Sequence, residues 1–138
     1  MNSCLEPGKQ AAWNMTSLLV QHFRDLDVYN KAFDISVEIH TQSLQFPKTE
    51  QFAMGDQIRR ASKSICANIA EGFGKQRGSR KEFKRYLTIA QGSAHEMLVW
   101  ISYCKELSLI TDDMATKWEA EYNSIIRMLG SLHNKIQD

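Results

Sequence analysis

The sequence has little of what marks a secreted, zinc-binding or membrane protein. Its three cysteines are an odd number and no two of them stand at Cys-x-x-Cys spacing, which argues against a disulfide framework and a zinc site. No apolar run approaches the length that crosses a bilayer. The first residues lack the basic segment and the apolar stretch of a secretory signal. We therefore expect a protein of a reducing, cytoplasmic compartment with no membrane partner.

Signatures of catalysis and of cofactor binding are also missing. No Glu-x-x-His pair occurs, so the di-iron site that some helical bundles carry is not expected. Neither a Gly-x-Ser-x-Gly nor a phosphate-loop pattern is present. Asn68, Glu71 and Glu96 are the residues we considered for catalysis, and we interpret them as helix-closing and interface groups. The prediction is a protein that is not an enzyme and holds no metal or cofactor.

Scarce proline and few alternating β-branched runs predict a helical chain. Only two prolines occur, and apolar residues recur at helical spacing over about 25–44, 49–71, 79–107 and 112–136. The last two segments keep the 4-3-4-3 spacing of a bundle seam. Short connections make sequential helices antiparallel. We expect an all-α, up-down-up-down four-helix bundle over residues 23–138, after a partly disordered N-terminal extension over residues 1–22.

Individual residues predict where these helices begin and end. Pro47 ends the first helix, because a residue before proline avoids the helical region. Gly72 is interpreted as the C-terminal stop of the second helix, followed by a basic loop. Ser79 and Glu82 have the spacing of a capping box, which predicts the start of the third helix. The fourth helix is expected after Thr111.

The charge of the chain is small in sum but uneven along the sequence. The net charge is +1, yet residues 57–88 hold nine basic and two acidic side chains, a net of +7, and the remainder has a net of −6. This split predicts a polarised surface, which either binds phosphates or is a solvated charged loop. The candidate nucleic-acid-binding residues are Arg59, Arg60, Lys63, Lys75, Arg77, Arg80, Lys81, Lys84 and Arg85.

The third predicted helix carries more apolar surface than one core requires. A second stripe runs beside its core seam, and the second helix has small residues on part of its outer face. One interpretation is a broad core stripe with chance alanines. The other, which we favour, is a homo-oligomer whose subunits meet through these faces. The candidate interface residues are Ala67, Ala70, Ile89, Ser93, Glu96, Trp100, Tyr103 and Leu107.

Several stretches resemble the bacterial four-helix bundle proteins of the ribosomal-RNA intervening-sequence family, which are encoded inside large-subunit ribosomal RNA genes or stand alone. The matching segments are 23–29, 57–61, 67–74 with its Ala-Asn-Ile-Ala-Glu-Gly run, 81–83, and 90–96, and the resemblance spans about 23–136. It implies a closed homopentamer. It also implies a relationship to the accessory proteins of diversity-generating retroelements, which are basic pentamers that bind nucleic acid and a reverse transcriptase.

Together these patterns predict a non-enzymatic oligomeric bundle that binds RNA or DNA backbone, or scaffolds a nucleic-acid complex, through the basic region 59–85. The alternative is a purely structural or protein-interaction homo-oligomer that works through the second apolar stripe. The partners expected are further copies of the chain, RNA or DNA, and a reverse transcriptase or another protein. The near-neutral net charge of the chain favours a local binding surface over a uniformly basic one.

Overall fold

The computed structural model describes residues 20–137, which form four long helices and two short ones. No strand occurs within this range. The predicted all-α fold class is therefore confirmed. The elements are η1 (Phe23–Asp25), α2 (Asp27–Ser43), α3 (Lys48–Gln51), α4 (Met54–Lys75), α5 (Arg80–Glu106) and α6 (Asp112–Lys135).

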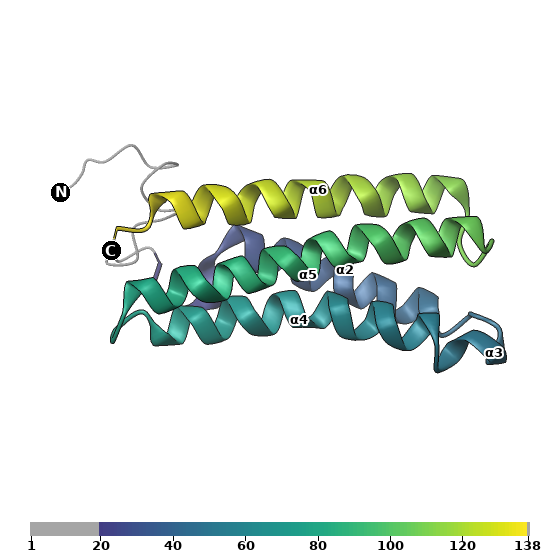
Figure 1. Ribbon diagram of the computed structural model, residues 1–138, viewed down its shortest axis with the longest axis horizontal. Coiled ribbons are helices and arrows are strands. Elements are labelled where there is room, and N and C mark those ends of the chain that lie inside the picture. The colour runs from purple at the N-terminus through teal and green to yellow at the C-terminus, as the bar shows by residue number, and fades with distance from the viewer. Residues whose placement is uncertain (1–19, 138) are drawn as a thin grey trace.

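The four long helices lie side by side as a bundle and reverse direction at each connection (Figure 1). Helix α2 packs on α4, α4 on α5, α5 on α6, and α6 packs back on α2. The turn between α4 and α5 lies at one end of the bundle, and α3 lies at the other end (Figure 1). This arrangement is the expected up-down-up-down bundle, and it decides which charged residues come together.

One apolar stripe from each long helix builds the core. The predicted seam of α5 is buried throughout from Phe83 to Cys104, and the seam that runs along α6 is buried from Trp118 to Ile136. Val20, the first described residue, is buried as well, so the packing begins before η1. The predicted disorder of residues 1–22 concerns mainly residues 1–19, which lie outside the described residues.

The second predicted helix is interrupted near its start. It was expected to run without a break from Thr49, but Phe52 and Ala53 separate α3 from α4, and Ala53 has non-helical angles of φ −113° and ψ −98°. The cause is a tertiary contact. The Gln51 side chain donates to the carbonyls of Ser43 and Phe46 at 3.0 and 2.8 Å, so α3 is held against the end of α2.

Gly72 lies inside α4 and does not end it. The predicted stop is wrong, because α4 continues to Lys75. Gly72 is buried, and a Cβ at this position would lie 2.6 Å from Tyr86 Cβ and 3.0 Å from Phe83 Cδ1. The absence of a side chain at Gly72 therefore allows α5 to pack closely against α4. A glycine with this packing role has the same sequence appearance as a glycine that terminates a helix.

Ser79 and Thr111 cap their helices as expected, whereas Thr49, expected to cap the second helix, lies inside α3. Ser79 Oγ accepts the backbone N–H of Glu82 at 3.2 Å, and Thr111 Oγ1 caps α6 in the same way at 3.1 Å. The reciprocal bond of the predicted capping box is replaced by others. The Ser79 N–H donates to the Lys75 carbonyl, and the Glu82 carboxylate accepts from Arg85 Nε and Nη2 at 3.2 and 3.1 Å.

A pair of alanine substitutions tests the packing at Gly72. We expect Gly72→Ala to lower the free energy of unfolding by about 1–3 kcal/mol, because an overpacked core must shift. Gly74→Ala is the matched control, since nothing lies within 4 Å of a Cβ at this exposed helical position. There alanine should raise stability by about 0.5–1 kcal/mol through helix propensity. Urea denaturation measures both, and equal effects would contradict the packing role.

Candidate nucleic-acid interface

The predicted basic region does not form one surface. Arg59, Arg60 and Lys63 lie in the first half of α4, whereas the other six cations lie at its end, in the following turn and in the start of α5. At a rise of about 1.5 Å per residue, about 24 Å of helix separates Arg59 from Lys75. The structure therefore brings together Lys75, Arg77, Arg80, Lys81, Lys84 and Arg85, which we call the basic end.

Arg59 holds the corner between α2, α3 and α4. Its Nη1 donates to Ser43 Oγ at 2.6 Å, and its Nη2 donates to the Gln51 carbonyl at 2.7 Å. Ser43 is buried and Arg59 is half-buried. The guanidinium is thus bonded to groups of the protein itself, and its role in the fold was missed because both partners belong to other elements.

Arg60 and Lys63 lie on the outer side of α4, away from the basic end. Arg60 Nε is 3.6 Å from Asp56 Oδ2, in an exposed pair one turn apart. Lys63 Nζ is 2.8 Å from His40 Nδ1 on α2. These two cations border the seam between α2 and α4, so they belong to a different surface from the basic end.

The basic end displays cations that the protein does not neutralise. Within residues 20–137, the side chains of Arg77, Arg80 and Lys81 make no ion pair or hydrogen bond. Arg85 is bonded to Glu82, and these bonds hold the pKa of the Glu82 carboxyl below its ordinary value. Six cations and the two nearby acids, Glu71 and Glu82, leave a net of +4 at this end. A strongly positive surface of this kind attracts phosphates.

The start of α5 adds backbone donors to these side chains. The first N–H groups of a helix have no intrahelical partner, and they form the positive end of the helix dipole. Ser79 Oγ takes the N–H of Glu82, so the N–H groups of Arg80 and Lys81 remain available at the end of the bundle. Backbone N–H groups at a helix start are common phosphate ligands.

Tyr86 organises the cations around it. Lys75 Nζ lies 5.9 Å and Arg85 Cζ lies 4.8 Å from the centroid of its ring. The Tyr86 hydroxyl donates to Glu71 Oε2 at 3.1 Å. Glu71 is thus bonded to a residue of α5 near the end of α4. These contacts join two helices, so the sequence around Tyr86 does not predict them.

The predicted interface residues of α5 form an exposed ridge. Ile89, Glu96, Tyr103 and Leu107 are exposed, and Trp100 is half-buried with its Nε1 donating to Glu96 Oε2 at 3.0 Å. Together these five residues are called the α5 ridge. Ser93, the remaining predicted residue of this stripe, faces α4, where its Oγ is 3.1 Å from Ser64 Oγ.

Ala67 and Ala70 line an apolar groove of about 470 Å³ between α2 and α4. Phe33 and Val37 form part of its α2 wall and are 47% and 49% exposed. Both residues lie beside core residues of α2, so apolar periodicity alone does not separate this wall from the core stripe. The full lining is Phe23, Tyr29, Phe33, Ser36, Val37, His40, Thr41, Lys63, Cys66, Ala67 and Ala70.

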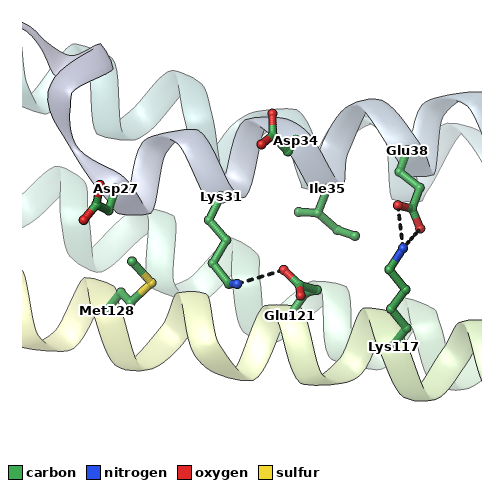
Figure 2. A pocket seen from close by; sticks show the side chains of 8 residues that line it. All are labelled: Asp27, Lys31, Asp34, Ile35, Glu38, Lys117, Glu121 and Met128. Carbon is green, nitrogen blue, oxygen red and sulfur yellow. Dashed lines mark hydrogen bonds and ion pairs between the residues drawn. The ribbon is translucent and has the colours of Figure 1, made fainter.

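A second groove of about 470 Å³ lies between α2 and α6, and two lysine–glutamate pairs cross it (Figure 2). Lys31 reaches Glu121 at 3.0 Å, and Lys117 reaches Glu38 at 2.9 Å. Glu38 also accepts from the indole of buried Trp118 at 2.8 Å. The bonds from Lys117 and Trp118 hold the pKa of Glu38 below its ordinary value. These ion pairs and the hydrogen bond from Trp118 therefore hold α2 against α6.

The residues considered for catalysis each have a separate hydrogen-bond partner. Asn68 Nδ2 donates to the Ser64 carbonyl at 2.8 Å, Glu71 accepts from Tyr86, and Glu96 accepts from Trp100. These bonds support structural roles, and the absence of catalysis stays a prediction. Among the described residues, no group of three or more His, Cys, Asp or Glu side chains could hold a metal ion.

Cys66 and Cys104 are buried, as their positions on the core faces predicted. Burial raises the pKa of Cys66 to about 11 and that of Cys104 to about 12. Both side chains are therefore neutral thiols near pH 7 and behave as small apolar groups. Within residues 20–137, no helix combines the length and the apolar character that crossing a membrane requires.

Residues 24–131 match the family model described as 23S rRNA-intervening sequence protein. A solved structure from Bacteroides thetaiotaomicron, a protein of unknown function from the S23 ribosomal protein family, is also similar. The two chains are 28% identical with a TM-score of 0.69, and the alignment covers 78% of this chain and 96% of that chain. Among curated proteins, none matches this sequence.

Substitutions at neighbouring arginines test the structural role of Arg59. We expect Arg59→Met to lower the free energy of unfolding by about 1.5–3 kcal/mol, because two charge-assisted hydrogen bonds are lost. Arg60→Met, which removes only an exposed pair, should change it by less than about 0.5 kcal/mol. Urea denaturation compares the variants. An unchanged stability of Arg59→Met would show that the corner does not depend on this guanidinium.

The lowered pKa of Glu38 predicts that its contribution to stability is sensitive to acid. Because the folded-state pKa lies below the unfolded value of about 4.3, the contribution is complete above that pH. It is lost as the pH falls through the folded-state pKa. Glu38→Gln keeps an oxygen for Trp118 but removes the charge, so it should cost about 0.5–1 kcal/mol at neutral pH. Unfolding curves at falling pH should show this difference shrinking, and a constant difference would refute the ionic origin.

Proposed function

Because the chain belongs to the 23S rRNA-intervening sequence protein family, we propose that it is an oligomeric bundle whose basic end binds the phosphate backbone of RNA or DNA. The observation that carries the proposal is the set of cations at the start of α5. Arg77, Arg80 and Lys81 have no partner within residues 20–137, and they lie beside free backbone N–H groups. The family name associates these proteins with ribosomal RNA genes, which fits a nucleic-acid partner.

The placement of these cations has an energetic cost that a bound anion would offset. Positive side chains near a helix N-terminus oppose the helix dipole and repel one another. Glu82 compensates for only part of this charge, because its carboxylate is bonded to Arg85. Phosphates that contact the basic end would release bound counterions and replace this repulsion with attraction. The proposed binding is therefore salt-dependent and independent of base sequence.

The proposed oligomer forms when the α5 ridge of one copy enters the apolar groove of the next. A ridge and a groove on different faces make a heterologous contact, which closes into a ring when the rotation allows it. Charge is complementary at this contact, because Lys63 lines the groove and Glu96 lies in the ridge. The resemblance to the family implies five copies. A ring of this kind gathers the basic ends on one rim, where several weak phosphate contacts act together.

A second candidate function is a protein-interaction or purely structural oligomer without a nucleic-acid partner. The exposed apolar surface favours it, since Tyr103 and Leu107 are each 52% exposed on the α5 ridge. In this case the α5 ridge and the apolar groove form the protein contacts, and the basic end is a solvated turn. Binding and assembly measurements separate the two candidates.

Charge reversal at the basic end tests nucleic-acid binding. In gel-shift titrations at low salt, Arg77→Glu with Lys81→Glu should weaken binding at least tenfold and lower the salt slope by about 2, because each phosphate contact contributes about 0.9. The matched control is Lys48→Glu with Lys105→Glu, which makes the same charge change at the opposite end of the bundle. Equal losses in both variants, or no binding of the unaltered protein, would contradict the proposal.

Light scattering of the full chain tests the oligomer. We expect the unaltered protein to be larger than a monomer, and Ala67→Arg in the groove or Tyr103→Glu in the ridge to shift it toward the monomer. Phe52→Ser is the control, because Phe52 is 92% exposed but lies outside both surfaces. A monomeric unaltered protein would overturn the ring, as would dissociation by the control substitution alone.

A further inference from the structure

We infer that the basic end recognises base-paired nucleic acid through its phosphates and does not bind single strands through their bases. The inference rests on the proposed function and specifies its substrate class. It comes from one juxtaposition, in which the aromatic rings beside the unpartnered cations of the basic end are buried or half-buried and already contact other side chains. The charges required for backbone contact are therefore present, whereas the rings that base contact would require are already engaged within the protein.

Proteins that bind single strands stack the bases on exposed aromatic rings, which accept any base because every base has a flat face. Three aromatic residues lie within or beside the basic end. Phe83 is fully buried, and Phe73 packs against it edge to face, with ring centroids 5.9 Å apart and an interplanar angle of 86°. These two rings belong to the junction between α4 and α5, where Phe83 offers no face to a base and Phe73 is half-buried against it.

Tyr86 is the third ring, and the cations of the basic end already lie over it. Arg85 Cζ is 4.8 Å and Lys75 Nζ is 5.9 Å from its centroid, and its hydroxyl is tied to Glu71. A base could stack on Tyr86 only by displacing a charged group from the ring. The same two cations would then be removed from positions at which phosphates can reach them.

Another ring at this end of the bundle is also occupied. Phe23 of η1 lies beneath Arg24, whose Cζ is 4.7 Å from its centroid, and it contacts the rings of His22 and Tyr29 at 4.4 and 4.8 Å. This ring lines the apolar groove and takes part in its wall. Within the described residues, the aromatic side chains near the basic end are thus buried or in contact with other side chains, and the ring of Phe23 belongs to the apolar groove.

The charged groups fit the phosphates of a duplex better than those of a single strand. Arg77 lies in the turn, and Arg80 and Lys81 lie in the first turn of α5, so they are spread over the blunt end of a helical hairpin. A duplex carries about one charge per 1.7 Å of its axis, which is twice the density of one strand. Several cations displayed at one end of the bundle therefore meet more phosphates on a duplex.

Fluorescence anisotropy with the full chain tests the inference. The probes are labelled duplex DNA, duplex RNA, single strands of the same length, and an abasic phosphodiester strand. We expect the duplexes to bind about tenfold or more tightly than the single strands, from their higher charge density. The normal and the abasic single strands should bind within about twofold of each other, because no base is contacted. The RNA and DNA arms distinguish the two sources of phosphate.

The outcomes separate this inference from the proposed function. Single strands that bind as tightly as duplexes, or that lose about tenfold when their bases are removed, would overturn the inference and leave phosphate binding intact. A protein that binds none of the probes at low salt would overturn both.

A Tyr86→Leu variant gives a second readout on the protein side. Leucine keeps the Cβ that packs at Gly72 and removes the ring, and circular dichroism checks that the bundle is still folded. Because Tyr86 also positions Lys75 and Arg85, any loss of binding should be equal within about twofold for normal and abasic single strands, whereas a stacking tyrosine would lose about fivefold or more on strands that carry bases only. A loss of that size confined to single strands that carry bases would also overturn the inference.

Discussion

The close contact between α4 and α5 at Gly72 is the constraint on which the rest of the candidate site depends. With no Cβ at this position, the Cβ of Tyr86 and the ring of Phe83 can lie directly against α4. The two helices therefore stay in contact up to the turn that joins them. Tyr86 is then close enough to bond Glu71 on α4 and to carry Lys75 and Arg85 over its ring. Core packing and the layout of surface charge are thus set by the same missing side chain.

The arginines of α4 and α5 show how surroundings decide what a cation does. Arg59 is half-buried and donates two short hydrogen bonds, so removing it leaves buried acceptors without a partner. Arg85 is exposed and bonded to Glu82, so its charge is largely used within the protein. Arg77 has neither burial nor a partner among the described residues. Only this last environment leaves a guanidinium free to bind phosphate, and a count of basic residues cannot separate the three.

Local signals predicted much of the fold from the sequence. The 4-3-4-3 seams of α5 and α6 predicted buried stripes from Phe83 to Cys104 and from Trp118 to Ile136, because periodicity is a property of one helix. The Ser79 and Thr111 caps are equally local. The errors all involve contacts between elements. The Gln51 side chain bonds the end of α2, and the second predicted helix is interrupted there. Gly72 lies inside α4 because side chains of α5 pack directly against it. Neither partner can be identified from the neighbouring sequence.

The near-zero net charge of the chain is the sum of a basic region and an acidic remainder. This separation of charge decides which charged surfaces an oligomer would expose. Along the α2–α6 seam the lysines bond directly to glutamates, so opposite charges cancel within a few ångströms (Figure 2). At the basic end the cations outnumber the acids, and the Arg85–Glu82 pair cancels only part of the charge. Since the field of an exposed charge is screened over about 8–10 Å at physiological salt, a phosphate responds to its nearest charges and not to the sum over the chain. Gathering copies into a ring would multiply the field of the basic end locally, while the lysine–glutamate pairs of the seam would add little field.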